Sequence, residues 1–256
     1  MPLLKEHRAD QLRVQVYQTR EEMGRAAGEA ALCILRSLLQ EKEEVNVIFA
    51  AAPSQNEMLD TLVGAKDVAW DRVNAFHMDE YVGLSSDAPQ GFGNFLTAHL
   101  FGKLPFKCVF RINSAADDPQ AECDRYAELL QEYPVDLVCL GIGENAHIAF
   151  NDPGVAEFQD PALVKLAQLD LVCRTQQVHD GCFPALSDVP TQAITLTVPA
   201  LTAAKHMVCT VPAATKRQAV ALTVLGPVTE DVPASIMQQH PGAVMFCDAD
   251  SGADLL

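Results

Sequence analysis

Basic side chains are scarce in this chain of 256 residues, which has 18 lysines and arginines against 34 aspartates and glutamates. The formal net charge of -16 argues against a nucleic-acid or anionic-membrane partner, because both need a basic surface. Long apolar runs are also missing, since none approaches the roughly 20 residues that cross a bilayer. The first twenty residues carry too much charge for a signal peptide. We therefore expect a soluble, cytoplasmic protein.

Sequence motifs for metals and nucleotides are missing as well. The eight cysteines form no CxxC pair and the histidines form no HxxxH pair, so we expect no metal site. Several cysteines lie in apolar runs, which favours reduced and buried thiols. The turn after the apolar run 45–52 lacks the glycines of a P-loop or a dinucleotide fingerprint, which excludes a nucleotide site built on those motifs.

Short apolar runs alternate with amphipathic stretches along the whole chain. The hydrophobic fraction of 49% suffices for a large core, and without repeats or a long linker we expect a single α/β domain over residues 1–256. A capping box at 19–22 predicts the start of a helix. The other predicted helices are 54–63, 92–101, 119–132 and 214–222, and the predicted strands are 45–52, 73–78, 108–112, 135–140, 194–198, 207–211 and 243–247. This alternation predicts a doubly wound, mostly parallel sheet with helices on both faces, similar to a Rossmann fold.

In such a fold, ligands bind where the parallel strands end. One such point opens a helix with Ser54 and Gln55, whose free N–H groups and dipole attract an anion, although Ser54 also fits a plain helix cap. Another carries the adjacent carboxylates Asp79 and Glu80. A carboxylate near a substrate carbon can act as a general base, and a solvated turn is the alternative interpretation.

The segment 141–153, GIGENAHIAFNDP, has the densest set of polar groups. Gly143 allows the backbone to approach a ligand closely. His147 is suited to proton transfer near neutral pH, and Asp152, five residues later, can orient its imidazole. A histidine with purely structural hydrogen bonds is the alternative. Lys216 and Arg174 are candidates for neutralising a phosphate, unless they are ordinary surface charges.

Together these segments resemble the glucosamine-6-phosphate deaminase (isomerase) family, within the superfamily that also holds 6-phosphogluconolactonase. The resemblance runs from about residue 15 to the C-terminus. It is carried by NAFHMDEYVGL at 74–84 and by GIGENAHIAFNDP, with support from 189–201 and 240–248. It implies that the enzyme opens the ring of glucosamine 6-phosphate, moves a proton between C2 and C1, and releases ammonia and fructose 6-phosphate. It also implies that neither a metal nor an organic cofactor takes part.

The resemblance also implies roles for individual residues. By position, Asp79 is the base for the C2 proton, and His147 assists ring opening by proton transfer at the ring oxygen. Asp152 stands where the family has a glutamate that orients this histidine. The remaining expected substrate-binding residues are Ser54, Gln55, Glu80, Gly143, Lys216 and, as the nearest counterpart of the family's phosphate-binding arginine, Arg174.

Two departures concern the surroundings of His147. Asn145 replaces an aspartate of the family, so we expect the imidazolium to lose an anionic neighbour. Asp152 is one methylene shorter than glutamate, so its contact with His147 needs a shifted backbone. These changes leave two alternatives open: an isomerase of another sugar phosphate or a lactonase-like hydrolase, and a sugar-phosphate-binding protein without turnover. The expected partner is a phosphorylated sugar in each case, and the sequence leaves a homo-oligomer open.

Overall fold

The computed structural model describes residues 3–179 and 181–256. Its strands are β1 Leu3–Ala9, β2 Leu12–Tyr17, β3 Val45–Phe49, β4 Val73–His77, β5 Asp79–Tyr81, β6 Cys108–Phe110, β7 Leu137–Leu140, β8 Val164–Gln168, β9 Gln192–Leu196, β10 His206–Val211 and β11 Ala243–Cys247. Its helices are α1 Arg20–Glu41, α2 Asn56–Gly64, α3 Phe92–Leu96, α4 Pro119–Glu132, α5 Leu171–His179, α6 Val198–Thr202 and α7 Arg217–Leu225.

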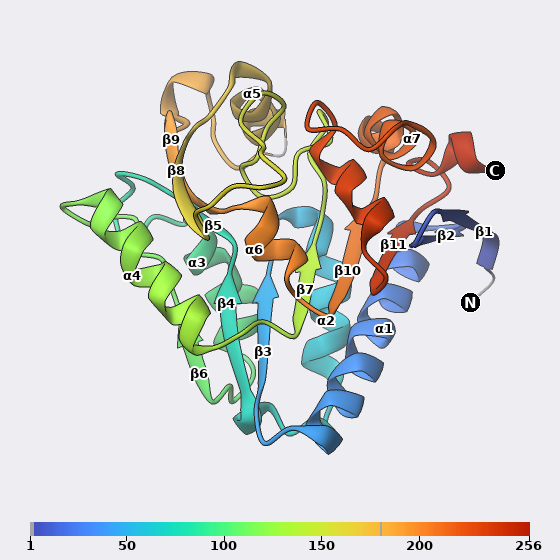
Figure 1. Ribbon diagram of the computed structural model, residues 1–256, viewed down its shortest axis with the longest axis horizontal. Helices are drawn as coiled ribbons and strands as arrows, with labels where there is room; N and C mark the ends of the chain where they lie inside the picture. Colours follow the sequence, from blue (N-terminus) through green and yellow to red (C-terminus); the bar gives the residue numbers. More distant parts are fainter. Residues whose placement is uncertain (1–2, 180) are drawn as a thin grey trace.

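The main sheet contains eight strands of the described chain in the order β1-β2-β11-β10-β7-β3-β4-β6. Neighbouring strands are parallel except for the hairpin of β1 and β2. The chain leaves β3 toward β4 and β6, and it returns on the other side of β3 as β7. The strand order therefore reverses between β3 and β7, and this is where a doubly wound sheet binds its ligands. Figure 1 shows the carboxyl ends of these strands pointing to the top of the molecule.

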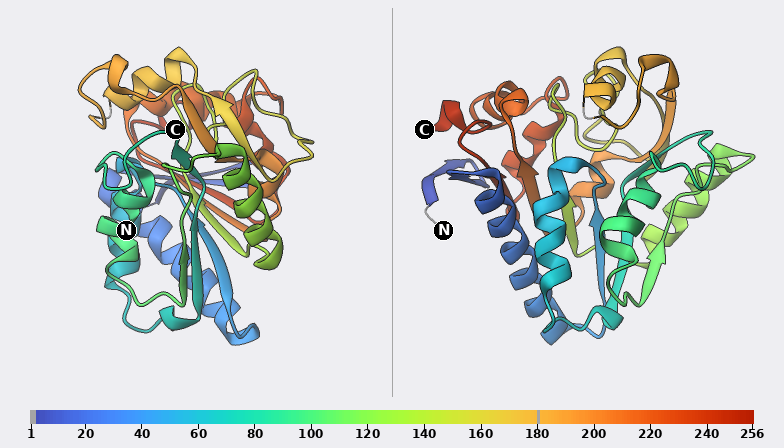
Figure 2. Two further views of the ribbon diagram at one scale, coloured as in Figure 1. Left: turned by 90° about the vertical axis from the view of Figure 1, so that its left-hand side faces the viewer. Right: turned by 180° about the vertical axis from the view of Figure 1, so that it is seen from behind.

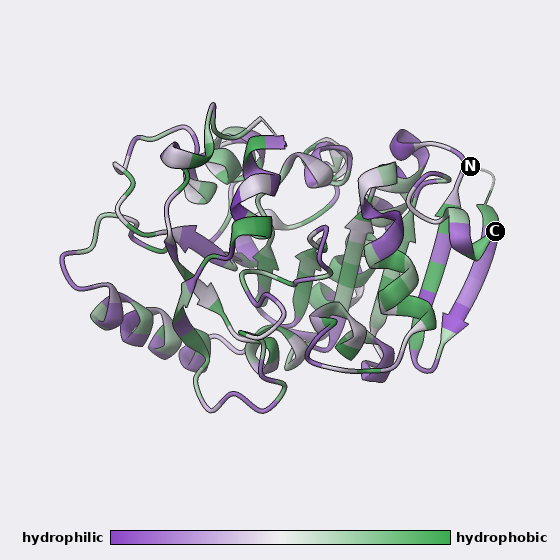
Figure 3. Ribbon diagram, turned by 90° about the horizontal axis from the view of Figure 1, so that it is seen from above, coloured by the Kyte–Doolittle hydropathy of each residue, from purple (hydrophilic) through white to green (hydrophobic). Residues whose placement is uncertain are grey.

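Helices cover both faces of the sheet, as predicted. Apolar residues of α1, α2 and α3 pack into one buried cluster, and those of α4, α6 and α7 pack into the other. The view from behind in Figure 2 shows α1 and α2 side by side on the first face. Figure 3, seen from above, shows hydrophobic residues concentrated in the central strands. No helix in the described part of the chain has the length and apolar character needed to cross a membrane.

A second, three-stranded antiparallel sheet lies over the carboxyl edge of the first (Figure 1). Its order is β5-β9-β8, and β5 follows β4 after the single residue Met78. The predicted strand at 194–198 forms β9 in this sheet. An apolar run buried on both sides has no feature that assigns it to one sheet or the other, so the sequence did not separate them.

The predicted helix starts agree with the structure to within a turn. Thr19 Oγ1 accepts the N–H of Glu22 at 3.2 Å and caps α1, as the capping box predicts. The predicted helix at 119–132 coincides with α4, which Asp118 caps. The helix predicted at 92–101 is α3 followed by a wider turn at Thr97–Phe101. Short 3₁₀ turns, Pro53–Gln55 and Ala214–Lys216, precede α2 and α7.

Candidate active site

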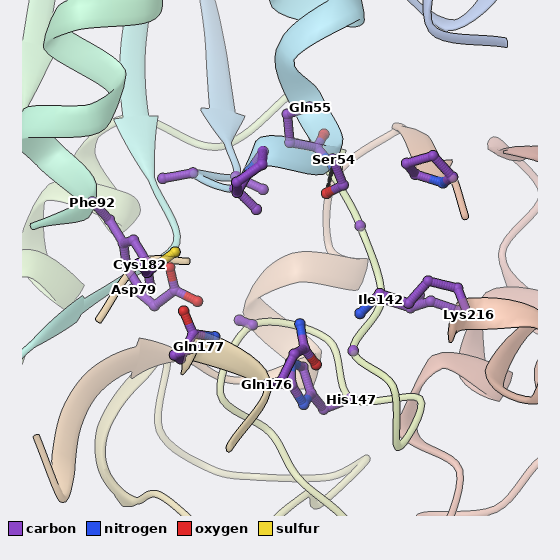
Figure 4. Close-up of a pocket in the computed structure, with 18 of the residues that line it drawn as sticks. Ser54, Gln55, Asp79, Phe92, Ile142, His147, Gln176, Gln177, Cys182 and Lys216 are labelled. Carbon is purple, nitrogen blue, oxygen red and sulfur yellow. Dashed lines mark hydrogen bonds between the residues drawn. The ribbon is translucent and has the colours of Figure 1, made fainter. Parts of the chain in front are cut away.

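Most of the predicted site residues line one pocket at the point where the strand order reverses. They are Ser54, Gln55, Asp79, Gly143, His147 and Lys216, and they follow β3, β4, β7 and β10. Figure 4 shows Asp79 and His147 entering this pocket from different segments, with Ser54 and Lys216 farther along it. The parallel strands thus bring together side chains that are up to 162 positions apart in sequence (54 to 216).

Asp79 is the first residue of β5, and a buried histidine fixes its backbone. The N–H of Ile112 donates to His77 Nε2 at 2.9 Å, so the ring proton is on Nδ1, which donates to the carbonyl oxygen of Asp79 at 2.9 Å. Burial lowers the pKa of His77 to about 3, so this histidine stays neutral. Burial, together with the nearby charge of Glu80, raises the pKa of the Asp79 carboxyl to about 8. The Asp79 carboxylate is therefore an unusually strong base.

Glu80 does not face the pocket, which corrects its predicted role in substrate binding. Its Oε1 accepts the N–H groups of Tyr81 and Phe92, both at 3.0 Å, and its Oε2 accepts that of Gly93 at 2.9 Å. Burial raises its pKa, although these three bonds oppose the shift. The carboxylate thus satisfies the free N–H groups at the start of α3, which is a structural role.

His147 is paired with a buried carboxylate. Its Nδ1 lies 2.8 Å from Asp152 Oδ1, so the shorter aspartate side chain does reach the imidazole. Asn145 Nδ2 donates to the same oxygen at 3.0 Å, and Asn145 Oδ1 accepts the N–H of His147 at 3.2 Å. Burial opposes ionisation of Asp152, but the bonds and charge of His147 and the amide of Asn145 hold its pKa below the ordinary value. Asn145 carries no charge, as expected, and Asp152 is the anionic group in contact with the imidazole.

The loop around His147 requires unusual backbone conformations. Ala146 and Ala149 have φ values of 63° and 47°, in the left-handed region that side-chain-bearing residues seldom adopt. A Cβ atom at Gly143 would lie 2.2 Å from His147 Cε1, so only glycine leaves room for the ring. Strain of this kind persists where the surrounding structure over-determines it, and it is common in functional loops.

The other end of the pocket carries positive charge. Among the described lining residues, the basic side chains are those of Arg20 and Lys216, and Lys216 is buried. Arg20 Nε lies 2.7 Å from Glu57 Oε1, and its Nη2 donates to the carbonyl of Pro53. These contacts hold the guanidinium beside the turn that contains Ser54. Two cationic side chains and a hydroxyl that line the same pocket are suited to binding a phosphate.

Sequence reasoning missed Arg20, which lies more than thirty residues before the turn that it contacts. The sequence signal that could have revealed it is a pair of glycines four residues apart in α1, Gly24 and Gly28. A Cβ atom at Gly24 would lie 2.3 Å from Glu57 Cβ, and one at Gly28 would lie 2.5 Å from Thr61 Cβ. Two small residues on one helix face allow α1 to approach α2 closely, and this approach places Arg20 at the pocket.

Arg174 is not part of the pocket, which corrects its predicted role in phosphate binding. It lies on α5, and its Nη2 donates to the carbonyls of Leu186 and Val189 at 2.9 and 2.8 Å. The same region lines the pocket with residues that the sequence did not point to, namely Gln176, Gln177 and Cys182. Figure 4 shows all three among the residues drawn around Asp79 and His147.

A third titratable side chain lies beside His147 and Asp152. Ligand atoms of His147, Asp152 and Cys173 all lie within 4.8 Å of one another, and all three residues are buried. Burial and the charge of Asp152 raise the pKa of the Cys173 thiol, so it is protonated at neutral pH. The set offers one nitrogen, one oxygen and one sulfur donor, a combination that no short sequence motif marks.

Comparisons with known proteins place this chain in a family. A family model described as glucosamine-6-phosphate isomerases/6-phosphogluconolactonase matches residues 18–246. A glucosamine-6-phosphate deaminase of Streptococcus sanguinis is 37% identical over 88% of this chain and 92% of its own length. The structure of a monomeric glucosamine-6-phosphate deaminase matches with a TM-score of 0.86 at 26% identity, covering 94% of this chain and 98% of that chain. A 6-phosphogluconolactonase from Trypanosoma brucei has the same fold, with a TM-score of 0.76 at 16% identity over 98% of this chain and 100% of its own.

Proposed function

Because the chain belongs to the family of glucosamine-6-phosphate isomerases and 6-phosphogluconolactonases, we propose that it is a glucosamine-6-phosphate deaminase. The reaction consumes glucosamine 6-phosphate and water, and it yields fructose 6-phosphate and ammonia. The observation that carries the proposal is the pairing of two proton-transfer groups in one pocket. Asp79 is a carboxyl of raised pKa, and His147 is backed by the Asp152 carboxylate.

Ring opening is the first task of the site. His147 moves a proton at the ring oxygen, which frees the aldehyde at C1. A histidine that transfers a proton becomes an imidazolium for part of the cycle, and a carboxylate in contact with it stabilises that form. The distance of 2.8 Å between Nδ1 and Asp152 Oδ1 supplies this contact.

Proton transfer between carbons is the second task. Asp79 removes the C2 proton as a carboxylate and returns it to C1, so that the double bond moves to C2 and the nitrogen. Water then releases the nitrogen as ammonia. A carboxylate whose pKa lies near 8 accepts a proton from carbon more readily than one of ordinary pKa.

The phosphate of the substrate belongs at the other end of the pocket. Arg20 and Lys216 supply positive charge there, and Ser54 supplies a hydroxyl at the start of the turn before α2. Arg20 has the phosphate-binding role that the resemblance implied for Arg174. Since the protein carries a net charge of -16, a local pair of cations is needed to hold a phosphate dianion.

The test is an assay of ammonia and fructose 6-phosphate formation from glucosamine 6-phosphate. We expect turnover by the wild type and none by Asp79→Asn. Arg20→Ala should raise KM roughly 10- to 100-fold, because a charge-assisted hydrogen bond is worth about 1.5–3 kcal/mol. Arg217→Ala is the matched control, since Arg217 follows Lys216 but pairs with Asp254 outside the pocket.

Two results would overturn the proposal. Wild-type turnover no greater than that of Asp79→Asn would remove glucosamine 6-phosphate as the substrate. Faster hydrolysis of 6-phosphogluconolactone than deamination would move the chain to the lactonase side of its family.

A further inference from the structure

Cys173 is a buried thiol beside the catalytic histidine, and the proposed chemistry does not use it. Its Sγ, a ring nitrogen of His147 and a carboxylate oxygen of Asp152 lie within 4.8 Å of one another. We propose that these three side chains bind a divalent ion of the zinc class, and that the bound ion disables the His147–Asp152 pair. The binding is independent of the proposed function, whereas the inhibition rests on it.

The distances are close to those of a metal site. Zinc binds sulfur at about 2.3 Å and nitrogen or oxygen at about 2.0–2.2 Å in a tetrahedral arrangement, so its ligand atoms lie roughly 3.3–3.7 Å apart. Donor atoms at the 4.8 Å limit must approach each other by about 1 Å when the ion binds. His147 Nδ1 and Asp152 Oδ1, now 2.8 Å apart, must separate slightly. Three protein ligands leave a fourth position free, which is typical of sites that exchange their ion or hold water.

The charges around the trio favour a cation. Asp152 is fully buried and ionised, and Asn145 Nδ2 fixes its Oδ1. Asp170 lies next to the thiol, since its Oδ1 accepts the N–H of Cys173 at 2.6 Å. When the ion binds, the thiol releases its proton to solvent and a metal–sulfur bond forms. The two positive charges of the ion are then balanced by the Asp152 carboxylate and the Cys173 thiolate, so the buried set of ion and ligands is neutral overall.

The donors also select the type of ion. Thiolate and imidazole prefer zinc or cobalt, whereas magnesium and calcium prefer oxygen ligands. An ion on His147 would separate the imidazole from Asp152 and prevent the ring from cycling between its protonated and neutral forms. The expected result is reversible loss of deaminase activity in zinc but not in magnesium.

The binding test uses cobalt as a coloured substitute for zinc. The chelator-treated full chain is titrated with Co²⁺, and sulfur-to-cobalt charge-transfer absorption is recorded. We expect one equivalent to produce the band in the wild type and in Cys182→Ser, because Cys182 lines the pocket outside the trio. Cys173→Ser should lack the band and bind zinc at least about tenfold more weakly in competition with a chelating dye. Cys173→Ala serves as a second variant if the serine protein has a lowered Tm.

The activity test separates the two parts of the proposal. Cys173→Ser should keep its turnover without zinc and resist zinc concentrations that inhibit the wild type. Absence of a thiolate band in the wild type, or equal zinc affinity of the Cys173 variants, would overturn the binding site. Equal zinc inhibition of the Cys173 variants would overturn the link to His147. If no variant deaminates glucosamine 6-phosphate, the cobalt titration still decides the metal site while the proposed function fails.

Discussion

The ionisation of Asp79 should control the rate of the enzyme across the neutral range. Burial, and after it the charge of Glu80, raises the pKa of this carboxyl from 3.8 to about 8. A general base acts in its ionised form, so roughly a tenth of the enzyme is competent at pH 7 and roughly nine tenths at pH 9. Below the midpoint, kcat/KM should therefore rise about tenfold per pH unit.

The assay is kcat/KM for glucosamine 6-phosphate between about pH 5.5 and 9.5, for the wild type and for Glu80→Gln. Removing the charge of Glu80 eliminates the second cause of the shift, so the midpoint of the variant should move to lower pH. The amino and phosphate groups of the substrate ionise identically in both experiments. A difference between the two midpoints therefore belongs to the protein. The Tm of the variant reports whether the start of α3 is still intact.

Two results would refute this reasoning. A value of kcat/KM that is already constant from about pH 6 upward would show that the Asp79 carboxyl ionises in the ordinary acidic range, despite its burial. Identical midpoints for the wild type and Glu80→Gln would show that the charge of Glu80 does not reach Asp79.

Three further predictions concern stability and the geometry of the site. The folded protein binds the Asp79 proton up to about pH 8 and the unfolded chain only to about pH 4, so the stability of the wild type falls as the pH rises from about 4 to about 8. In thermal melts, Asp79→Asn should therefore have a higher Tm than the wild type between these pH values and an equal Tm below about pH 4. Asp152→Asn should lower kcat by about 10²–10⁴-fold in the deaminase assay with little change in KM, because His147 loses its anionic partner. Gly143→Ala should abolish activity because its Cβ would meet His147 at 2.2 Å, whereas Gly64→Ala, with no atom within 4 Å of the added Cβ, should retain it.

The sequence predicted the doubly wound sheet and the position of the site for one physical reason. Hydrophobic periodicity identifies strands and helices, and parallel strands end at a common edge. Residues after β3, β4, β7 and β10 must therefore converge whatever their separation in the chain. This reasoning located Ser54, Asp79, His147 and Lys216 in one pocket.

The direction of single side chains was harder to predict. Asp79 and Glu80 are neighbours in β5, and successive side chains of a strand point to opposite faces. One carboxylate therefore reaches the pocket and the other reaches α3. No pattern in the sequence distinguishes a strand from a turn at these two residues. Arg20 could not be predicted for a different reason, because its position at the pocket depends on how α1 packs against α2.

The two departures around His147, Asn145 and Asp152, act together on the charge beside the imidazole. Asn145 donates to Asp152 Oδ1 at 3.0 Å, and the same oxygen lies 2.8 Å from His147 Nδ1. An aspartate at position 145 would put a second carboxylate beside the first, and the repulsion would raise the pKa of one of them. An amide there does the opposite, since it helps to keep the buried Asp152 ionised. The chain thus retains one negative charge in contact with the imidazole, and this is the charge that an imidazolium intermediate needs.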